Sequence, residues 1–224
     1  SLEKVIPDKA GLTTVGQSSD INFNLAREAA TLISPSSEDL NALLPSPPET
    51  YDYIVIFTDQ RTQQQCSTCQ PSYVLPVNAF QNSLLSLYGP SGSNQLLSNR
   101  LSSYSFEQLT NYLDGKIETN DTYLAGNLNR AQWVIFNIKD LDADLPESYA
   151  LRRLLSERFD LLRDKKIIVF SYDAPYYLDA TEISKLSAYY GLYSSGQAFI
   201  DVAARVLMQE IQARHPVPPV RFPA

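Results

Sequence analysis

The chain has 224 residues, of which 44% are apolar and 19% charged, a composition typical of a globular domain with a substantial core. The 18 Lys and Arg residues against 25 Asp and Glu residues give a formal net charge of −7, which argues against a surface for nucleic acid or for anionic membranes. The sequence contains no apolar run near the ~20 residues of a membrane span, and its first residues contain no signal-peptide core.

The predicted elements begin after an irregular lead-in over residues 1–18. A helix is expected at 22–30 and a short strand at 31–33. The clearest strand is 51–58, a β-branched and aromatic run with little alternation, as in strands that are covered on both faces. A polar, glutamine-rich loop at 59–75 follows this strand.

The second half of the chain repeats the alternation of strands with helices, the rhythm of an open α/β sheet. The remaining predicted elements are helices at 77–88 and 106–113, a strand at 133–138, a helix at 146–162, a strand at 167–172, a short helix at 183–186, a strand at 188–193 and a helix at 197–212. Right-handed crossovers place helices on both faces of such a sheet. We therefore expect an open, mostly parallel sheet in a three-layer α/β/α sandwich, forming one domain at 19–212 with a Pro-rich tail at 213–224.

Glycine, histidine and cysteine are rare in this chain, and their scarcity argues against several kinds of binding and catalytic site. The eight glycines form neither a dinucleotide-binding nor a P-loop pattern, so no cofactor is expected. The single histidine, His215, lies in the tail, and a catalytic triad or a histidine metal site would have to use it. Cys66 and Cys69 form a lone CxxC, half of a zinc ribbon, so no metal is expected.

The same CxxC leaves three states open: a redox pair, a local disulfide or two thiols. Thioredoxin-type pairs lie at a helix N-terminus directly after a strand. Cys66 and Cys69 lie inside the polar loop instead, which favours a disulfide that staples the loop in an oxidising compartment. An extracellular or cell-envelope location in a bacterium would fit such a disulfide.

Candidate substrate-binding residues follow two of the strong strands, because open α/β sheets bind ligands beyond the carboxyl ends of their strands. Asp59 and Arg61 follow the strand at 51–58, and Asp173 and Tyr176 follow the strand at 167–172. Asp59 and Asp173 could form a carboxylate pair for acid–base work, with Arg61 as a clamp for an anion and Tyr176 stacked on a sugar ring. The alternatives are that the aspartates cap turns, that Arg61 pairs with Asp59, and that the tyrosines pack in the core or at a domain interface.

Three stretches resemble a known family. Residues 166–179, KIIVFSYDAPYYLD, look like the late strand and turn of the C-terminal, non-barrel domain of bacterial family 3 glycoside hydrolases, in the β-N-acetylhexosaminidase-like branch. Residues 186–194 with 198–211 are similar to the ending of that domain, and 26–33 to its opening helix and strand. The closing segment at 216–223 lacks the glycine that usually precedes it.

The resemblance implies a retaining glycosidase whose (β/α)8 barrel carries the Asp nucleophile and, in this branch, a His–Asp acid/base pair. The chain contains no barrel-length segment before the domain, so no catalytic residue is assigned. The implied partner is the N-terminal barrel of the same parent chain, with carbohydrate contacted indirectly and the isolated domain inactive. The alternatives are a free-standing carbohydrate-binding or protein-interaction module and a flavodoxin-like ligand binder.

Overall fold

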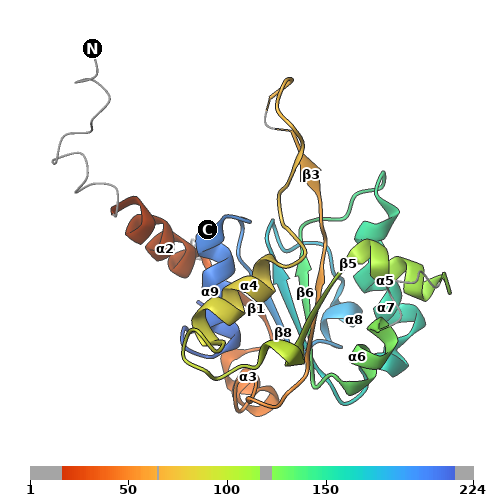
Figure 1. Ribbon diagram of the computed structural model, residues 1–224. Helices are drawn as coiled ribbons and strands as arrows, with labels where there is room; N and C mark the ends of the chain where they lie inside the picture. Colours follow the sequence, from red (N-terminus) through yellow and green to blue (C-terminus); the bar gives the residue numbers. More distant parts are fainter. Residues whose placement is uncertain (1–16, 65, 117–122, 215–224) are drawn as a thin grey trace, which may run out of the picture.

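The computed structural model describes residues 17–64, 66–116 and 123–214 (Figure 1). Most of the expected lead-in and tail, including His215, lies outside the described residues. The main sheet has six strands in the order β1-β8-β7-β6-β2-β5. Their bounds are β1 (Thr31–Ser34), β2 (Ile54–Thr58), β5 (Leu101–Ser105), β6 (Trp133–Ile138), β7 (Lys166–Ser171) and β8 (Ala188–Gly191).

The path of the chain through the sheet creates one topological switch point. Five strands are parallel, and β1 joins β8 antiparallel at one edge. From β2 the chain moves to β5 on one side, then crosses to β6, β7 and β8 on the other. Without β1, this is the strand order of flavodoxin-like sheets, which bind ligands where the carboxyl ends of the two central strands diverge. Here those two strands are β2 and β6.

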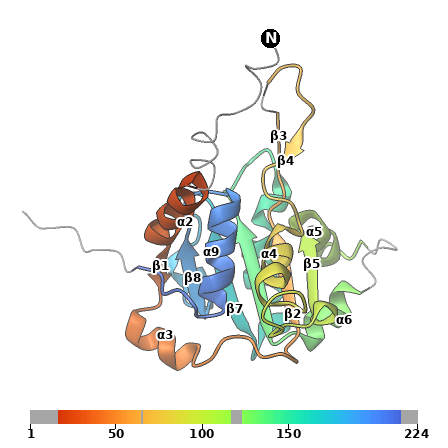
Figure 2. The same cartoon turned by 60° about the vertical axis from the view of Figure 1, so that its left-hand side comes forward.

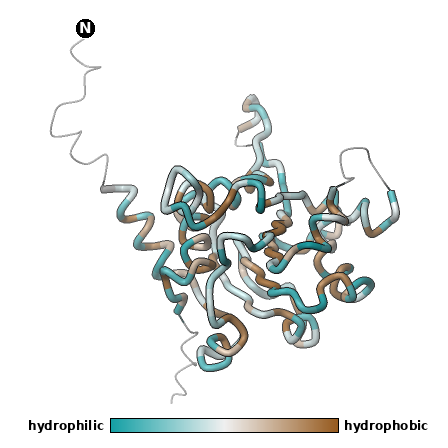
Figure 3. The backbone as a smooth tube through the Cα atoms, turned by 60° about the horizontal axis from the view of Figure 1, so that its bottom comes forward, coloured by the Kyte–Doolittle hydropathy of each residue, from teal (hydrophilic) through white to brown (hydrophobic). Residues whose placement is uncertain are grey.

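Helices cover both faces of the sheet, so the expected three-layer sandwich is confirmed (Figures 1 and 2). One face packs against α2 (Gln17–Ala29), α4 (Ala79–Tyr88) and α9 (Gln197–Leu207). The other packs against α5 (Phe106–Leu113), α6 (Leu124–Arg130) and α7 (Ala150–Glu157). Hydrophilic and hydrophobic residues alternate along the helices, as expected for helices with one buried side (Figure 3).

The continuous apolar strands follow from this two-sided burial. In β2, Ile54 and Ile56 enter the core of one face while Val55 and Phe57 enter the core of the other, and all are essentially inaccessible. Apolar and polar residues do not alternate in this strand, because both faces of the strand are buried. Within the described residues, no helix is long and apolar enough to cross a membrane.

Among the described residues, β5, α3 (Ser37–Leu43) and α6 have no counterpart in the sequence prediction, and neither do the 3-10 turn Ser98–Arg100 and the hairpin described below. The strand β5 reads Leu-Ser-Ser-Tyr-Ser and lies at the sheet edge, with only Leu101 and Tyr104 buried. An edge strand needs no apolar run, so its hydropathy does not reveal it. The helices α3 and α6 have seven residues each, too short for a periodic pattern to stand out.

Several predicted helices are wrong in extent. The helix expected at 22–30 is α2, which begins earlier, at Gln17. The helix predicted at 146–162 is a 3-10 turn (Pro146–Tyr149), α7 and a second 3-10 turn (Phe159–Leu162), because Arg158 leaves the helical region with φ −137°. The last helix ends at Leu207, not at 212. Gln209 takes φ 56° there, and the amides of Gln209 and Glu210 donate to the carbonyls of Val206 and Arg205, which is a Schellman ending.

The loop predicted at 59–75 contains a small hairpin formed by β3 (Thr62–Gln63) and β4 (Ser72–Tyr73). It projects from the edge of the sheet where the parallel strands end (Figure 1). The short helix predicted at 183–186 is displaced. The helix in the structure is α8 (Ala180–Ile183), which shares only Ile183 with the predicted range and begins in a capping box between Asp179 and Glu182.

Candidate functional site

The carboxyl edge of the sheet brings together the segments that follow β2, β6 and β7. Asp59 is the first residue after β2, and its amide continues the ladder by donating to the carbonyl of Asn137 at 2.9 Å. The residue is only 2% exposed. Its Oδ2 accepts a hydrogen bond from the amide of Lys139 at 3.2 Å, so the carboxylate ties the end of β2 to the end of β6.

Arg61 closes over this carboxylate with two hydrogen bonds. Its Nε donates to Oδ1 of Asp59 at 3.0 Å and its Nη2 to Oδ2 at 2.9 Å. Nη2 also donates to the carbonyl of Asp140, and Nη1 lies against the carboxylates of Asp140 and, at 3.5 Å, Asp142. With three carboxylates around it and a side chain only 10% exposed, the guanidinium has no direction left open for an anionic ligand.

Burial has the largest single influence on the pKa of each residue in this pair, but it decides the direction only for Asp59. It raises the pKa of Asp59, while the hydrogen bond and charge of Arg61 and the amide of Lys139 oppose that rise. For Arg61 burial lowers the pKa, but the surrounding carboxylates outweigh it and hold the pKa above its usual value. Arg61 therefore stays charged, and the cluster joins two loops at the switch point.

The cluster is closed rather than hollow. The pocket beside it, lined by Asp140, Arg152 and Tyr177 among others, has a volume of about 10 Å³. That is roughly the space one water molecule needs. The carboxylate of Asp59 is thus held by protein groups and is not presented to a ligand-sized cavity in the described part of the chain.

Asp173 and Lys139 extend the cluster toward β7. The Oδ2 of Asp173 lies 3.7 Å from Nζ of Lys139, and its Oδ1 accepts from the amide of Ala174 at 2.9 Å. Asp173 therefore binds the backbone of the residue that follows it. Lys139 contacts both aspartates, Asp59 through its amide and Asp173 through its ammonium group, so each carboxylate has its own partner and the two do not share a proton site.

Tyr176 is the most exposed of the predicted site residues, at 86%. Its neighbour Tyr177 is half-buried, and burial together with the nearby Asp173 and Asp140 raises its pKa. Tyr73 on the hairpin and Tyr193 after β8 are also exposed at this edge. The carboxyl edge thus presents three solvent-facing tyrosines around the closed ion-pair cluster of Asp59, Arg61, Asp140 and Asp142.

Cys66 and Cys69 are joined by a disulfide in the hairpin, with a Cα–Cα distance of 5.0 Å. The side-chain amide of Gln64 donates to the carbonyl of Cys69 at 2.9 Å and to that of Ser67 at 3.2 Å. In the ranges that the structure describes, no three His, Cys, Asp or Glu side chains come together as a metal site.

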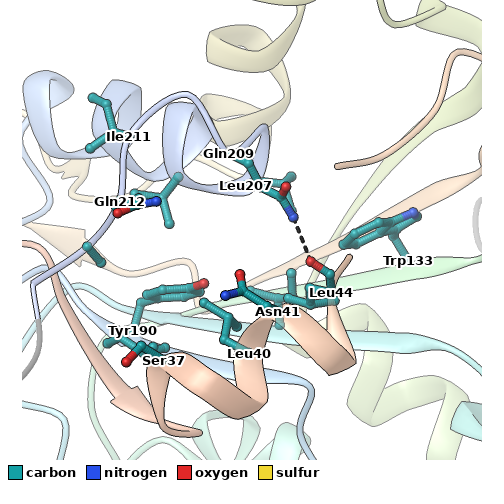
Figure 4. Close-up of a pocket in the computed structure, with 14 residues that line it drawn as sticks. Ser37, Leu40, Asn41, Leu44, Trp133, Tyr190, Leu207, Gln209, Ile211 and Gln212 are labelled. Carbon is teal, nitrogen blue, oxygen red and sulfur yellow. Dashed lines mark hydrogen bonds between the residues drawn. The ribbon is translucent and has the colours of Figure 1, made fainter. Parts of the chain in front are cut away.

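A second hollow, which sequence reasoning missed, lies on the α9 face of the sheet (Figure 4). It has a volume of about 450 Å³ and is bounded by α3, by the end of α9 and the residues after it, and by strands β1, β6, β7 and β8. No local pattern could have revealed it, because α3 itself was not predicted and the other walls come from distant parts of the chain.

Neither the family models nor the curated proteins contain a sequence match to this chain. Several solved structures, however, are similar to this chain in fold. A fungal multi-domain family 3 β-N-acetylglucosaminidase, whose structure includes a GCN5-related glucosamine N-acetyltransferase region, has a TM-score of 0.55 at 17% identity, over 96% of this chain and 21% of that one. A family 3 β-N-acetylglucosaminidase from Paenibacillus has a TM-score of 0.54 at 12% identity, over 94% and 35%.

A β-glucosidase from Listeria innocua, solved with isofagomine, has a TM-score of 0.51 at 14% identity, over 88% of this chain and 26% of that one. The fold of the chain is therefore that of one region of the family 3 glycoside hydrolases, and the resemblance seen in the sequence is confirmed at the level of the fold. The chain spans only between 21% and 35% of the length of these three structures.

Proposed function

We propose that this chain is the C-terminal accessory domain of a family 3 glycoside hydrolase of the β-N-acetylhexosaminidase-like branch. The domain packs on the (β/α)8 barrel of the same polypeptide through the carboxyl edge of its sheet and borders the substrate cleft. The match of nearly the whole chain to a minor part of several glycosidases supports an accessory role. The two β-N-acetylglucosaminidases among them support the choice of branch.

The proposed docking surface is supported by the exposed tyrosines at the carboxyl edge. Tyr73, Tyr176 and Tyr193 are 56%, 86% and 47% exposed. Tyrosine is enriched at protein interfaces, where one side of the ring is apolar and the hydroxyl finds a polar partner. The hairpin adds an arm beyond the sheet that can reach across a neighbouring domain.

The four predicted substrate-binding residues take different roles in this proposal. Tyr176, with Asp173 beside it, faces the barrel or a sugar that occupies the cleft. Asp59 and Arg61 support the docking surface without contacting the barrel or the sugar, because their hydrogen bonds hold the ends of β2 and β6 at a fixed separation. A disulfide in the exposed hairpin suits the oxidising compartment in which many secreted polysaccharide-degrading proteins work.

The test compares the chain with the complete polypeptide encoded by its gene, using aryl β-N-acetylglucosaminides and aryl β-glucosides. We expect the complete polypeptide to hydrolyse the glucosaminide and the isolated chain to hydrolyse neither. Tyr176→Ala in the complete polypeptide should lower turnover without changing the unfolding of the isolated domain. Turnover by the isolated chain that disappears when one of its own carboxylates is replaced would contradict the proposal.

A further inference from the structure

The hollow on the α9 face, called here the amino-edge pocket, has the dimensions of a small-molecule site. Its volume of about 450 Å³ lies in the range of roughly 300–1,000 Å³ usual for such sites. Trp133 is the first residue of β6, and Gln209 and Gln212 follow the end of α9, so the pocket opens away from the carboxyl edge where Asp59 and Tyr176 lie. It is therefore independent of the proposed docking surface.

The lining of the amino-edge pocket is uncharged. Among the described residues, the fourteen that line it include no Asp, Glu, Lys, Arg or His, in a chain that is 19% charged. A charged ligand would lose water there and gain no opposite charge in return. The pocket thus selects against ions.

Tyr190 supplies a polar group at the floor of the pocket. The residue is 5% exposed, and its hydroxyl, which points into the pocket in Figure 4, has no hydrogen-bond partner among the described residues. Burial raises the pKa of Tyr190 to about 12, so the hydroxyl stays protonated and can both donate and accept. Water reaches the hydroxyl in the open pocket, and a ligand oxygen would take the place of that water.

The mouth of the pocket carries side-chain amides and aromatic surface. Gln209 donates through Nε2 to the carbonyl of Leu44 at 2.9 Å, which fixes its side chain and leaves its Oε1 as an acceptor (Figure 4). Asn41 and Gln212 line the same mouth. The indole N–H of Trp133 is already used by Asp52 at 2.9 Å, so this ring offers the pocket only its apolar surface.

Hydroxyl and amide groups set among aromatic and aliphatic surfaces match a molecule with an apolar C–H face and hydroxyls at its edge. We propose that the amino-edge pocket binds an uncharged mono- or disaccharide, held by the hydroxyl of Tyr190 and the amides of Asn41, Gln209 and Gln212. Binding needs no movement of the sheet, since the floor strands are in register and packed.

The experiment is an NMR titration of the ¹⁵N-labelled chain with glucose, N-acetylglucosamine, cellobiose and chitobiose, and with glucuronate and glucose 6-phosphate as charged controls. We expect at least one neutral sugar to shift the side-chain amide signals of Asn41, Gln209 and Gln212, and the charged sugars to shift none of them. Failure of every neutral sugar, or equal binding of the charged ones, would overturn the proposal.

Two variants locate the site. Tyr190→Phe removes only the hydroxyl and should weaken binding about tenfold, whereas Tyr123→Phe, exposed just before α6 on the opposite face of the sheet, should leave it unchanged. Asn41→Ala changes an exposed side chain, cannot disturb the core and should also weaken binding. If both Tyr190→Phe and Asn41→Ala bind like the unmodified chain, the pocket is not the site.

Discussion

Arg61 holds the buried carboxylate of Asp59 through two parallel hydrogen bonds, Nε to Oδ1 at 3.0 Å and Nη2 to Oδ2 at 2.9 Å. The two residues are separated only by Gln60, directly after the first buried strand. The pair occupies the switch point of the sheet, where flavodoxin-like folds bind ligands, and fills it with protein groups. At a position where related folds bind a ligand, this pair instead holds the ends of β2 and β6 together.

The first prediction concerns that pair. Arg61→Met leaves the carboxylate of Asp59 buried without its cation, which should lower the free energy of unfolding by about 3–5 kcal/mol in urea denaturation at neutral pH. The double variant Asp59→Asn/Arg61→Met removes both charges and should recover much of the loss. A double variant at least as unstable as the single one would show that the stability does not depend on the charge left unpaired.

The second prediction separates the exposed tyrosines from the core. Tyr176→Ala should change the free energy of unfolding of the domain by less than about 0.5 kcal/mol, because a solvent-facing ring contributes little packing. Tyr189→Ala, at a fully buried tyrosine of β8, should cost about 3–5 kcal/mol. Equal losses in thermal unfolding would mean that Tyr176 belongs to the core and would remove the basis of the docking surface.

The two-sided burial of β2, β6 and β7 made these strands predictable, because a run such as Ile54–Thr58 has no polar residue to place on a solvent face before its end. The same rule fails for β5, whose serines suit a sheet edge. Strand position alone predicts that the candidate residues Asp59, Arg61, Asp173 and Tyr176 lie at the carboxyl edge of the sheet, and they lie there in the structure. Their partners were not foreseeable in full, since the contacts of Arg61 with Asp140 and Asp142 depend on the path of a loop.

The amino-edge pocket shows a second limit of sequence reasoning. Its wall α3 has seven residues and buries none of them, so it has no hydrophobic stripe. Gln209 reaches the mouth only because the last helix stops in a left-handed turn, where a glycine would be the usual signal. A pocket built from such features becomes visible only in three dimensions.

The third prediction is a pH dependence. Hydrogen bonds from Lys116 and then Arg153 hold the pKa of Asp114 below its usual value of 3.8. The folded state therefore binds this proton more weakly than the unfolded chain. The resulting stabilisation is present above pH 3.8 and is lost as the pH falls through the lower pKa of the folded state.

Urea unfolding of the unmodified chain and of Asp114→Asn at about pH 6 and about pH 3 tests this sign. The unmodified chain should be the more stable of the two at the higher pH, and the difference should shrink at the lower pH. A difference that grows on acidification would contradict the assignment. Since Asp114 is at the surface, added salt should reduce the difference as well.

The fourth prediction concerns the disulfide. The hairpin has exposed strands and lies outside the packed sandwich, so its opening should be a local event. Cys66→Ser/Cys69→Ser should leave the thermal midpoint of the domain unchanged and increase amide hydrogen exchange in the hairpin alone. A lowered midpoint would show that the loop closed by Cys66 and Cys69 supports the sheet.

The docking of the carboxyl edge on a catalytic barrel is tested most directly by photo-cross-linking in the complete polypeptide. A benzophenone-bearing phenylalanine analogue replaces Tyr176, 86% exposed at the carboxyl edge, or Tyr51, 74% exposed just before β2 at the opposite edge. The account predicts cross-links from position 176 to a (β/α)8 barrel and none from position 51. Cross-links from position 51 with none from 176, or a complete polypeptide without a barrel, would contradict it.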